Sequence, residues 1–289
     1  MKRSIVHVWI LPLFLLALLS ADVLAVTASE YATVINLAGR QRMLTQKMSK
    51  EMLLVAKGVD ADANRAALAK TADLFDTTLK GLRDGDAGLG LPPTEDAVTL
   101  RQLGKVDALW QQFHAVVAKV VEGGDVDIDK VAELNLPLLK DMNTAVRLYE
   151  KAASKQTGKS AGVVINLAGK QRMLTQKMSK EVLLVALGHD ADANKANLRN
   201  TASLFDRTLK GLKDGDSDLE LPATGDAAIR TQLDTVDGLW QQFRPLVERA
   251  GAVEATALPD ADLAQVAKLN LPLLAEMNKA VKMYEQAAQ

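Results

Sequence analysis

The chain has 289 residues, no cysteine and a formal net charge of −1. The lack of cysteine excludes disulfide bonds, thiolate metal sites and a thiol nucleophile, and the balanced charge argues against nucleic acid as a partner. Because 48% of the residues are hydrophobic but only 4% are aromatic, the composition favours an all-helical fold over a sheet.

Residues 1–25 have the pattern of a secretory signal peptide. Lys2 and Arg3 precede an apolar run over residues 5–19, and Ala25 ends a small-residue cleavage site. The run is short for a membrane span, which needs about 20 residues. We therefore expect cleavage after Ala25 and a periplasmic mature chain, with an uncleaved N-terminal membrane anchor as the alternative.

The rest of the chain contains one unit twice. Residues 26–155 form the first repeat and residues 156–289 the second; Trp240 lies 130 residues after Trp110, and the offset grows to 135 by Leu269, which matches Leu134. Each unit is too long for a solenoid repeat and has the length of a small domain. We expect two domains in tandem.

Each repeat shows four amphipathic helical patterns with short connections. In the first repeat we expect Asp62 and Thr94 to cap the second and third helices. Pro137 and Pro272 lie inside the fourth helices, where we expect a kink and not a break because the apolar stripe continues in phase. The predicted fold class is all-α, with two tandem up-down-up-down four-helix bundles after the signal segment.

The junction between the repeats, residues 154–162, is polar and contains two glycines. It could be a flexible hinge or part of one long helix shared by both bundles. The absence of proline favours the long helix.

One stretch is nearly identical in both repeats. Residues 35–51 read INLAGRQRMLTQKMSKE, and residues 165–181 differ only by Lys170 in place of Arg40. Other parts of the repeats have drifted, so more than an amphipathic pattern restrains this helix. One stripe along it combines apolar residues, a glycine, an arginine and uncharged polar residues, which is typical of neither a solvent face nor a hydrophobic core.

The arginines of this stripe need acceptors. Gly39 and Gly169 would let a neighbouring helix approach closely, and Arg42 and Arg172 would face the same neighbour one turn later. Such an arginine binds a carboxylate, carbonyl oxygens or a planar anion held by two hydrogen bonds. From periodicity alone, a local salt bridge with plain packing remains the alternative.

The stretch also resembles two families of sensory domains. Ile-Asn-x-Ala-Gly-x-x-Arg-Met is similar to the periplasmic P-box of the nitrate/nitrite sensor kinases. Asn-Leu-Ala-Gly-Arg-Gln-Arg-Met-Leu-Thr-Gln-x-Met is more similar still to the N-terminal, PilJ-type domain of type IV pilus methyl-accepting chemotaxis transducers. The resemblance is strong over the first helix of each repeat and loose over the other three. It implies a four-helix periplasmic sensory bundle, with Arg42 and Arg172 at the position of the arginine that binds the anion where two nitrate-sensor subunits meet.

Two facing arginines repel each other, and an anion between them relieves the repulsion. Sensor kinases form such an arginine pair from two chains. A tandem duplication could form it within one chain, with Arg42 against Arg172, and a homodimer is the alternative. The duplicated asparagines on the fourth helix either satisfy polar groups of the first helix or line a pocket; they are Asn135, Asn143, Asn270 and Asn278. The candidate ligand-binding residues are Asn36, Gly39, Arg42, Gln46, Asn166, Gly169, Arg172 and Gln176.

The sequence contains no nucleophile with an acid–base partner and no histidine pair with metal-ligand spacing. We therefore expect a non-enzymatic protein without a cofactor or a metal. The sequence shows no second membrane span, kinase or methyl-accepting coiled coil, so signalling would need another protein. The leading hypothesis is recognition of a small ligand, such as the oxyanions nitrate or nitrite. The alternative is a helical module that docks on a membrane chemoreceptor, a sensor kinase or a pilus component.

Overall fold

The computed structural model describes residues 26–288 apart from residues 158 and 255–257. The predicted signal peptide and its cleavage site lie outside the described residues. The described chain begins with a capping box at the first helix, in which the Thr27 hydroxyl accepts from the Glu30 backbone N–H and the Glu30 carboxylate accepts from the Thr27 backbone N–H.

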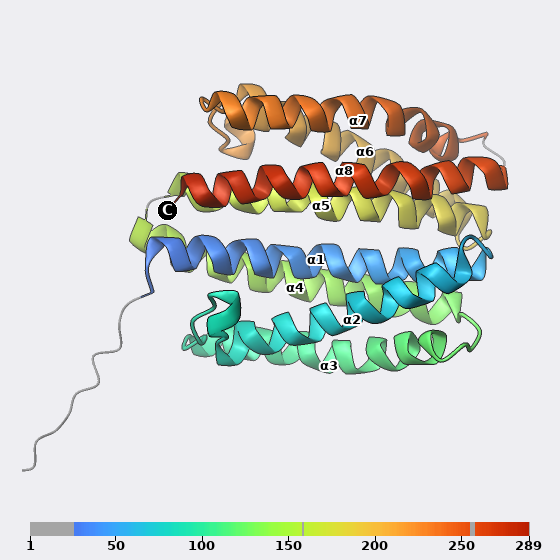
Figure 1. Cartoon of the computed structure of the whole chain (residues 1–289), viewed down its shortest axis with the longest axis horizontal. Coiled ribbons are helices and arrows are strands. Elements are labelled where there is room, and N and C mark those ends of the chain that lie inside the picture. The colour runs from blue at the N-terminus through green and yellow to red at the C-terminus, as the bar shows by residue number, and fades with distance from the viewer. Residues whose placement is uncertain (1–25, 158, 255–257, 289) are drawn as a thin grey trace, which may run out of the picture.

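The α-helices of the described residues run along one common axis and form two groups of four (Figure 1). Short 3₁₀ helices, η1 and η2, follow the second helix of each group. This arrangement confirms the all-α fold with two tandem four-helix bundles. The elements of the first repeat are α1 (Ala28–Ala56), α2 (Ala61–Asp84), η1 (Ala87–Leu89), α3 (Ala97–Val121) and α4 (Ile128–Thr157). Those of the second are α5 (Lys159–Ala186), α6 (Ala191–Asp214), η2 (Ser217–Leu219), α7 (Ala227–Gly251) and α8 (Asp260–Ala287).

Helices α1 and α5 lie side by side at the centre of the molecule (Figure 1). Helix α1 packs on α2 and α4 of its own repeat and on α5 of the other, and α5 packs correspondingly on α6, α8 and α1. Between residues 34 and 55, every residue of α1 is buried except the half-buried Arg40 and Lys47. A helix with neighbours on all sides has no face free to vary, which explains why this stretch is nearly identical in the two repeats.

Apolar and polar contacts hold each bundle together in the same way. Phe75 and Trp110 pack with ring centroids 4.4 Å apart, and both side chains are buried in the core of the first bundle. The buried Gln41 side chain donates from Nε2 to the Phe75 carbonyl at 2.8 Å, which ties α1 to α2. In the second bundle, Gln171 makes the same contact to Phe205, also at 2.8 Å.

The prolines inside the fourth helices do not interrupt them. Helix α4 continues through Pro137 and α8 through Pro272. The expectation that neither helix breaks is confirmed.

Two helix starts differ from the sequence-based expectation. Helix α2 begins at Ala61, so Asp62 lies in its first turn and Asp60 precedes it with a left-handed φ of 43°. Helix α3 is capped by Asp96, whose carboxylate accepts from the Thr99 backbone N–H at 2.7 Å. Thr94 lies two residues before this cap, and its hydroxyl points instead to the Leu82 carbonyl, to which it donates at 2.6 Å.

The junction between the repeats differs from the expected long helix. Helix α4 ends at Thr157, α5 begins at Lys159, and residue 158 between them is outside the described residues. Contacts of Asn166 with Glu150 and of Lys180 with Asn135 show that α4 and α5 pack side by side in opposite directions. The chain therefore reverses between α4 and α5, which lets α5 pack on α1 as well as on α4.

Because the two bundles share the α1–α5 contact, we expect them to unfold together. Phe75→Ala should cost about 3–5 kcal/mol of unfolding free energy through the cavity it leaves. Native-state hydrogen exchange would then show protection falling to a similar extent in α2–α3 and in α6–α7. A loss confined to the first repeat would mean that the bundles are independent units.

Candidate functional site

Arg42 lies in the middle of α1 and reaches two other helices. Its Nη1 atom donates to Asn143 Oδ1 of α4 at 2.8 Å, and its Nη2 atom donates to Asn166 Oδ1 of α5 at 2.7 Å. Arg172 mirrors it from α5, donating to Asn278 Oδ1 of α8 at 2.9 Å and to the Asn36 carbonyl of α1 at 3.1 Å. The two repeats are thus related by reciprocal contacts, as in a two-fold symmetric dimer.

Two glycines bring the guanidinium groups together. A Cβ atom at Gly39 would lie 3.3 Å from Arg42 Nη2 and 3.8 Å from Arg172 Nη2; at Gly169 the corresponding distances to Arg172 and Arg42 would be 3.3 and 3.9 Å. Both Nη2 atoms therefore occupy the same small space between α1 and α5. The structure places Arg42 and Arg172 against each other within one chain, with Gly39 and Gly169 at the point of close approach.

The arginine pair is buried and has only neutral acceptors. Each arginine is 1% exposed. Within the described residues, no carboxylate forms an ion pair with either guanidinium, and the Nε atom of each arginine has no hydrogen-bond partner. The carboxylates that interact with the arginines electrostatically, Glu150 and Glu285, accept instead from the side-chain amides of Asn166 and Asn36, at 2.7 and 2.6 Å.

Burial strongly disfavours the charged state of this pair. Desolvation lowers the pKa of Arg42 to about 10. Desolvation and the nearby Arg40 and Arg42 charges lower the pKa of Arg172 to about 9. Burial likewise raises the pKa of Glu150. The two cations at the centre of the molecule thus have carboxylates nearby but no direct ion pair among the described residues, and an anion placed between them would be stabilised by both.

The other predicted site residues divide into two groups. Asn36 and Asn166 belong to the arginine pair, since each supplies an acceptor to the arginine of the other repeat. Gln46 and Gln176 lie one turn further along α1 and α5. They donate to Asn135 and Asn270 at 3.0 and 2.8 Å and so join the first helix of each repeat to its fourth helix.

Sequence reasoning missed a second pair of buried cations. Lys50 Nζ crosses to Asn270 Oδ1 at 3.1 Å, and Lys180 Nζ crosses to Asn135 Oδ1 at 2.9 Å. Desolvation lowers the pKa of each lysine to about 8. The sequence did contain a sign of this pair, since both lysines belong to the duplicated stretch. Glu150 and Glu285 are also duplicated, at equivalent positions 135 residues apart, and could have been identified from that repetition.

The single difference within the duplicated stretch changes a contact between the first and second helices of a repeat. Arg40 Nη2 donates to Thr78 Oγ1 at 3.4 Å, joining α1 to α2. With Lys170 in that position, the equivalent Thr208 hydroxyl is buried without a partner among the described residues. The change therefore alters the contact between α5 and α6, while the positive charge beside the arginine pair is kept.

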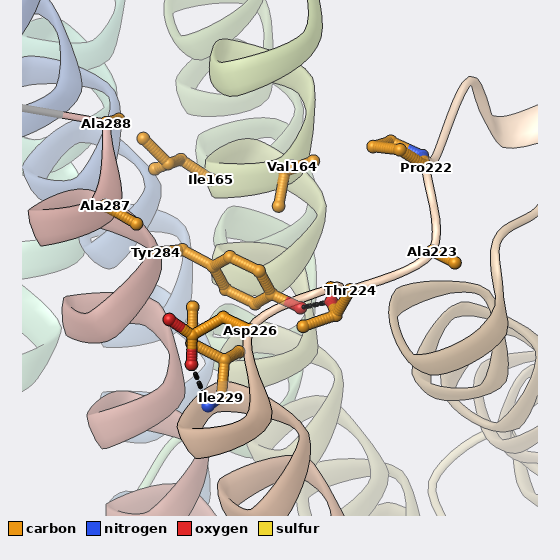
Figure 2. A pocket seen from close by; sticks show the side chains of 11 residues that line it. Val164, Ile165, Pro222, Ala223, Thr224, Asp226, Ile229, Tyr284, Ala287 and Ala288 are labelled. Carbon is orange, nitrogen blue, oxygen red and sulfur yellow. Dashed lines mark hydrogen bonds between the residues drawn. The ribbon is translucent and has the colours of Figure 1, made fainter.

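A separate, mostly apolar pocket of ≈240 Å³ lies at the end of the second repeat (Figure 2). The Tyr284 and Thr224 hydroxyls point toward each other and share a hydrogen bond, and the Asp226 carboxylate accepts from the Ile229 backbone N–H at 3.0 Å. These polar groups are already paired within the protein. The pocket therefore offers a ligand mainly apolar contact, and neither arginine lines it.

Comparison with known families fits this architecture. Residues 24–132 and 153–268 each match the family model described as Type IV pili methyl-accepting chemotaxis transducer N-term, or PilJ. The chain belongs to the PilJ family. The two matched segments are consistent with tandem copies of the domain, one on each helix bundle.

Two relatives are methyl-accepting chemotaxis proteins by name. McpN of Pseudomonas aeruginosa is 31% identical over 124 residues, which is 43% of this chain and 22% of the relative. AlkN of Alcanivorax borkumensis is 23% identical over 232 residues, which is 79% of this chain and 32% of the relative. The chain thus spans less than a third of the length of either relative. Among the residues described here, none of the helices combines the length and the apolar character needed to cross a membrane.

The buried lysines predict an unusual dependence of stability on pH. Because the pKa of Lys50 and Lys180 is about 8 in the fold and 10.5 in the unfolded chain, unfolding takes up protons between these values. Stability should therefore rise with pH there, by at most about 1.4 kcal/mol per pH unit for each lysine. Chemical denaturation from pH 7.5 to 10 would measure the slope. A Lys50→Met, Lys180→Met variant should lose most of the slope below about pH 9, whereas above it the lowered pKa values of Arg42 and Arg172 leave a slope of the same sign. An unchanged slope below pH 9 would contradict the assignment.

Proposed function

We propose that this chain is a non-enzymatic sensory protein of the periplasm that binds a small oxyanion, such as nitrate or nitrite, between Arg42 and Arg172. The observation that carries the proposal is the contact of two buried guanidinium groups with only neutral acceptors. A stable fold rarely brings two unpaired cations together in its centre, because each loses hydration and repels the other. An anion would offset both costs.

The hydrogen bonds of the pair suit a small acceptor. Each guanidinium carries an unpaired Nε–H donor, and the two Nη2 groups already meet near Gly39 and Gly169. A planar trigonal anion can accept from two guanidinium groups at once. Because the two repeats supply the two arginines, one chain would bind one anion without a second subunit.

Binding at this point could be converted into a signal through helix spacing. Arg42 contacts α4 and α5, and Arg172 contacts α1 and α8. An anion that draws the arginines together would therefore act on four helices at once. The named relatives are chemotaxis proteins, so we propose that the anion-bound form docks on a membrane chemoreceptor, a sensor kinase or a pilus component.

Thermal unfolding of the chain from Val26 onward, with and without millimolar nitrate, nitrite, sulfate or phosphate, tests the site. Sodium chloride at equal ionic strength serves as the salt control. An anion at about 100 times its dissociation constant should add about 2.7 kcal/mol of stability. The shift should vanish in Arg42→Ala with Arg172→Ala. It should persist in Arg40→Lys, which introduces the residue found at position 170.

The absence of a shift with every anion would favour docking without a small ligand. Leu136 and Leu271 occupy equivalent positions on α4 and α8, and each is 55% exposed. These two leucines would then be the first positions to mutate in a search for a protein partner.

A further inference from the structure

One carboxylate reaches Arg42 through a single asparagine side chain. Glu150 of α4 accepts from Asn166 Nδ2 at 2.7 Å, and Asn166 Oδ1 accepts from Arg42 Nη2 at 2.7 Å. Hydrogen bonds in such a chain polarise one another. The negative charge of Glu150 therefore acts on the guanidinium although an asparagine separates the two groups, and it opposes the lowering of the Arg42 pKa by burial.

The second repeat places a carboxylate in the same relation to Arg172. Glu285 of α8 accepts from Asn36 Nδ2 at 2.6 Å, and the Asn36 backbone carbonyl accepts from Arg172 Nη2 at 3.1 Å. The charge of Glu285 likewise opposes the lowering of the Arg172 pKa. Two carboxylates, one on each fourth helix, thus lie close to the space between the arginines.

Both carboxylates are kept although a neighbouring charge has changed. Glu150 and Glu285 occupy equivalent positions in the two repeats, whereas the next residue is Lys151 in the first repeat and Gln286 in the second. A neutral acceptor would satisfy the N–H group of each asparagine. The charge of these two residues is therefore not needed to hold the asparagines, and its effect falls on the arginine pair.

The charges around the arginine pair limit how much negative charge it can accept. Arg40 and Lys170 add positive charge beside the pair, and Arg147 acts from the exposed face of α4. Glu150 and Glu285 supply the opposing negative charge. Without these two carboxylates, an anion at the arginines would meet a site with two more units of positive charge.

The burial of the site makes it sensitive to the charge of its ligand. An anion between the arginines leaves water, since each arginine is 1% exposed. The cost of removing an ion from water grows with the square of its charge, whereas its attraction to the arginines grows in direct proportion to the charge. A doubly charged anion is thus about four times as costly to desolvate as a singly charged one of equal size, for about twice the attraction.

We propose that Glu150 and Glu285 act as a charge filter that restricts the arginine site to singly charged anions. This role rests on the anion site proposed above and adds to it the residues that set its selectivity. The carboxylates lower the positive charge that an anion meets, so that the attraction offsets the desolvation of one negative charge but not of two. They act on the ligand through the arginine pair and without contact.

Isothermal titration of the full chain with sodium nitrate and sodium sulfate, at equal ionic strength, tests the filter. We expect nitrate to bind at least about tenfold more tightly than sulfate. In Glu150→Gln with Glu285→Gln, each glutamine oxygen can still accept from its asparagine, but both negative charges are gone. Sulfate binding should then strengthen about tenfold more than nitrate binding, because the lost repulsion scales with the charge of the ligand. Structural damage would instead weaken the binding of both anions.

Glu133→Gln with Glu276→Gln is the matched control. These residues lie on the same two helices, give the same change in net charge and pair with the exposed Lys130 and Lys279. The ratio of nitrate to sulfate affinity should stay within about twofold of the native ratio, because solvent screens exposed charges. Glu285→Gln alone should change the ratio in the same direction as the double variant by a smaller factor, and it serves as the test if the double variant does not fold.

The outcomes separate the filter from the site on which it rests. The filter is overturned if the native chain binds sulfate as tightly as nitrate, if removal of the two carboxylates leaves the native affinity ratio, or if the control changes the ratio equally. In each of these cases an anion site remains. The absence of saturable heat with nitrate, nitrite and sulfate in every chain would instead overturn the arginine site, and the filter with it.

Discussion

The burial of two arginines against each other, at the contact of α1 and α5, is the constraint on which the rest of the structure depends. A guanidinium removed from water must find acceptors. Asn143 and Asn278 supply them from the fourth helices, and the Asn36 and Asn166 carbonyls supply them from across the interface. The positions of α4 and α8 relative to the central pair are therefore set by the needs of the two side chains. Gly39 and Gly169 complete the arrangement because any larger residue would press on the guanidinium groups.

The two kinds of contact in the molecule have different consequences. Inside each bundle, aromatic and aliphatic side chains such as Phe75 and Trp110 form an apolar core that is insensitive to charge. Between the bundles, α1 presents Arg42 and Lys50, two turns apart, and α5 presents Arg172 and Lys180. Each of these side chains is buried and bonded to a neutral amide or carbonyl. Each bundle is thus held mainly by apolar packing, while the contact between the bundles carries buried charge, and this contact is where a charged ligand can act.

Duplication within one chain also frees the two halves to diverge. In a symmetric dimer each substitution appears twice, whereas here Lys170 changes the α5–α6 contact and leaves Arg40 on α1. The fourth helices have diverged further, since Lys268 stands in the second repeat where the first has Glu133. The arginine pair has stayed symmetric because each half needs the other.

The sequence by itself determined the all-helical class, the two repeats and the duplicated stretch with Arg42 and Arg172. Helical periodicity and internal repetition depend only on which residues follow one another along the chain. It could not determine the neighbours of that stretch. Periodicity shows that a face is buried but not which helix covers it, so Gln46 was grouped with the arginines although it binds Asn135, and Lys50 was not recognised as buried at all.

Helix starts were missed for a related reason: Thr94 has the chemistry of a cap, but its hydroxyl bonds to Leu82 and Tyr149, which are distant in sequence. The reversal of the chain between α4 and α5 was likewise decided only by tertiary structure, since the packing of α5 on α1 and α4 involves residues far apart in sequence.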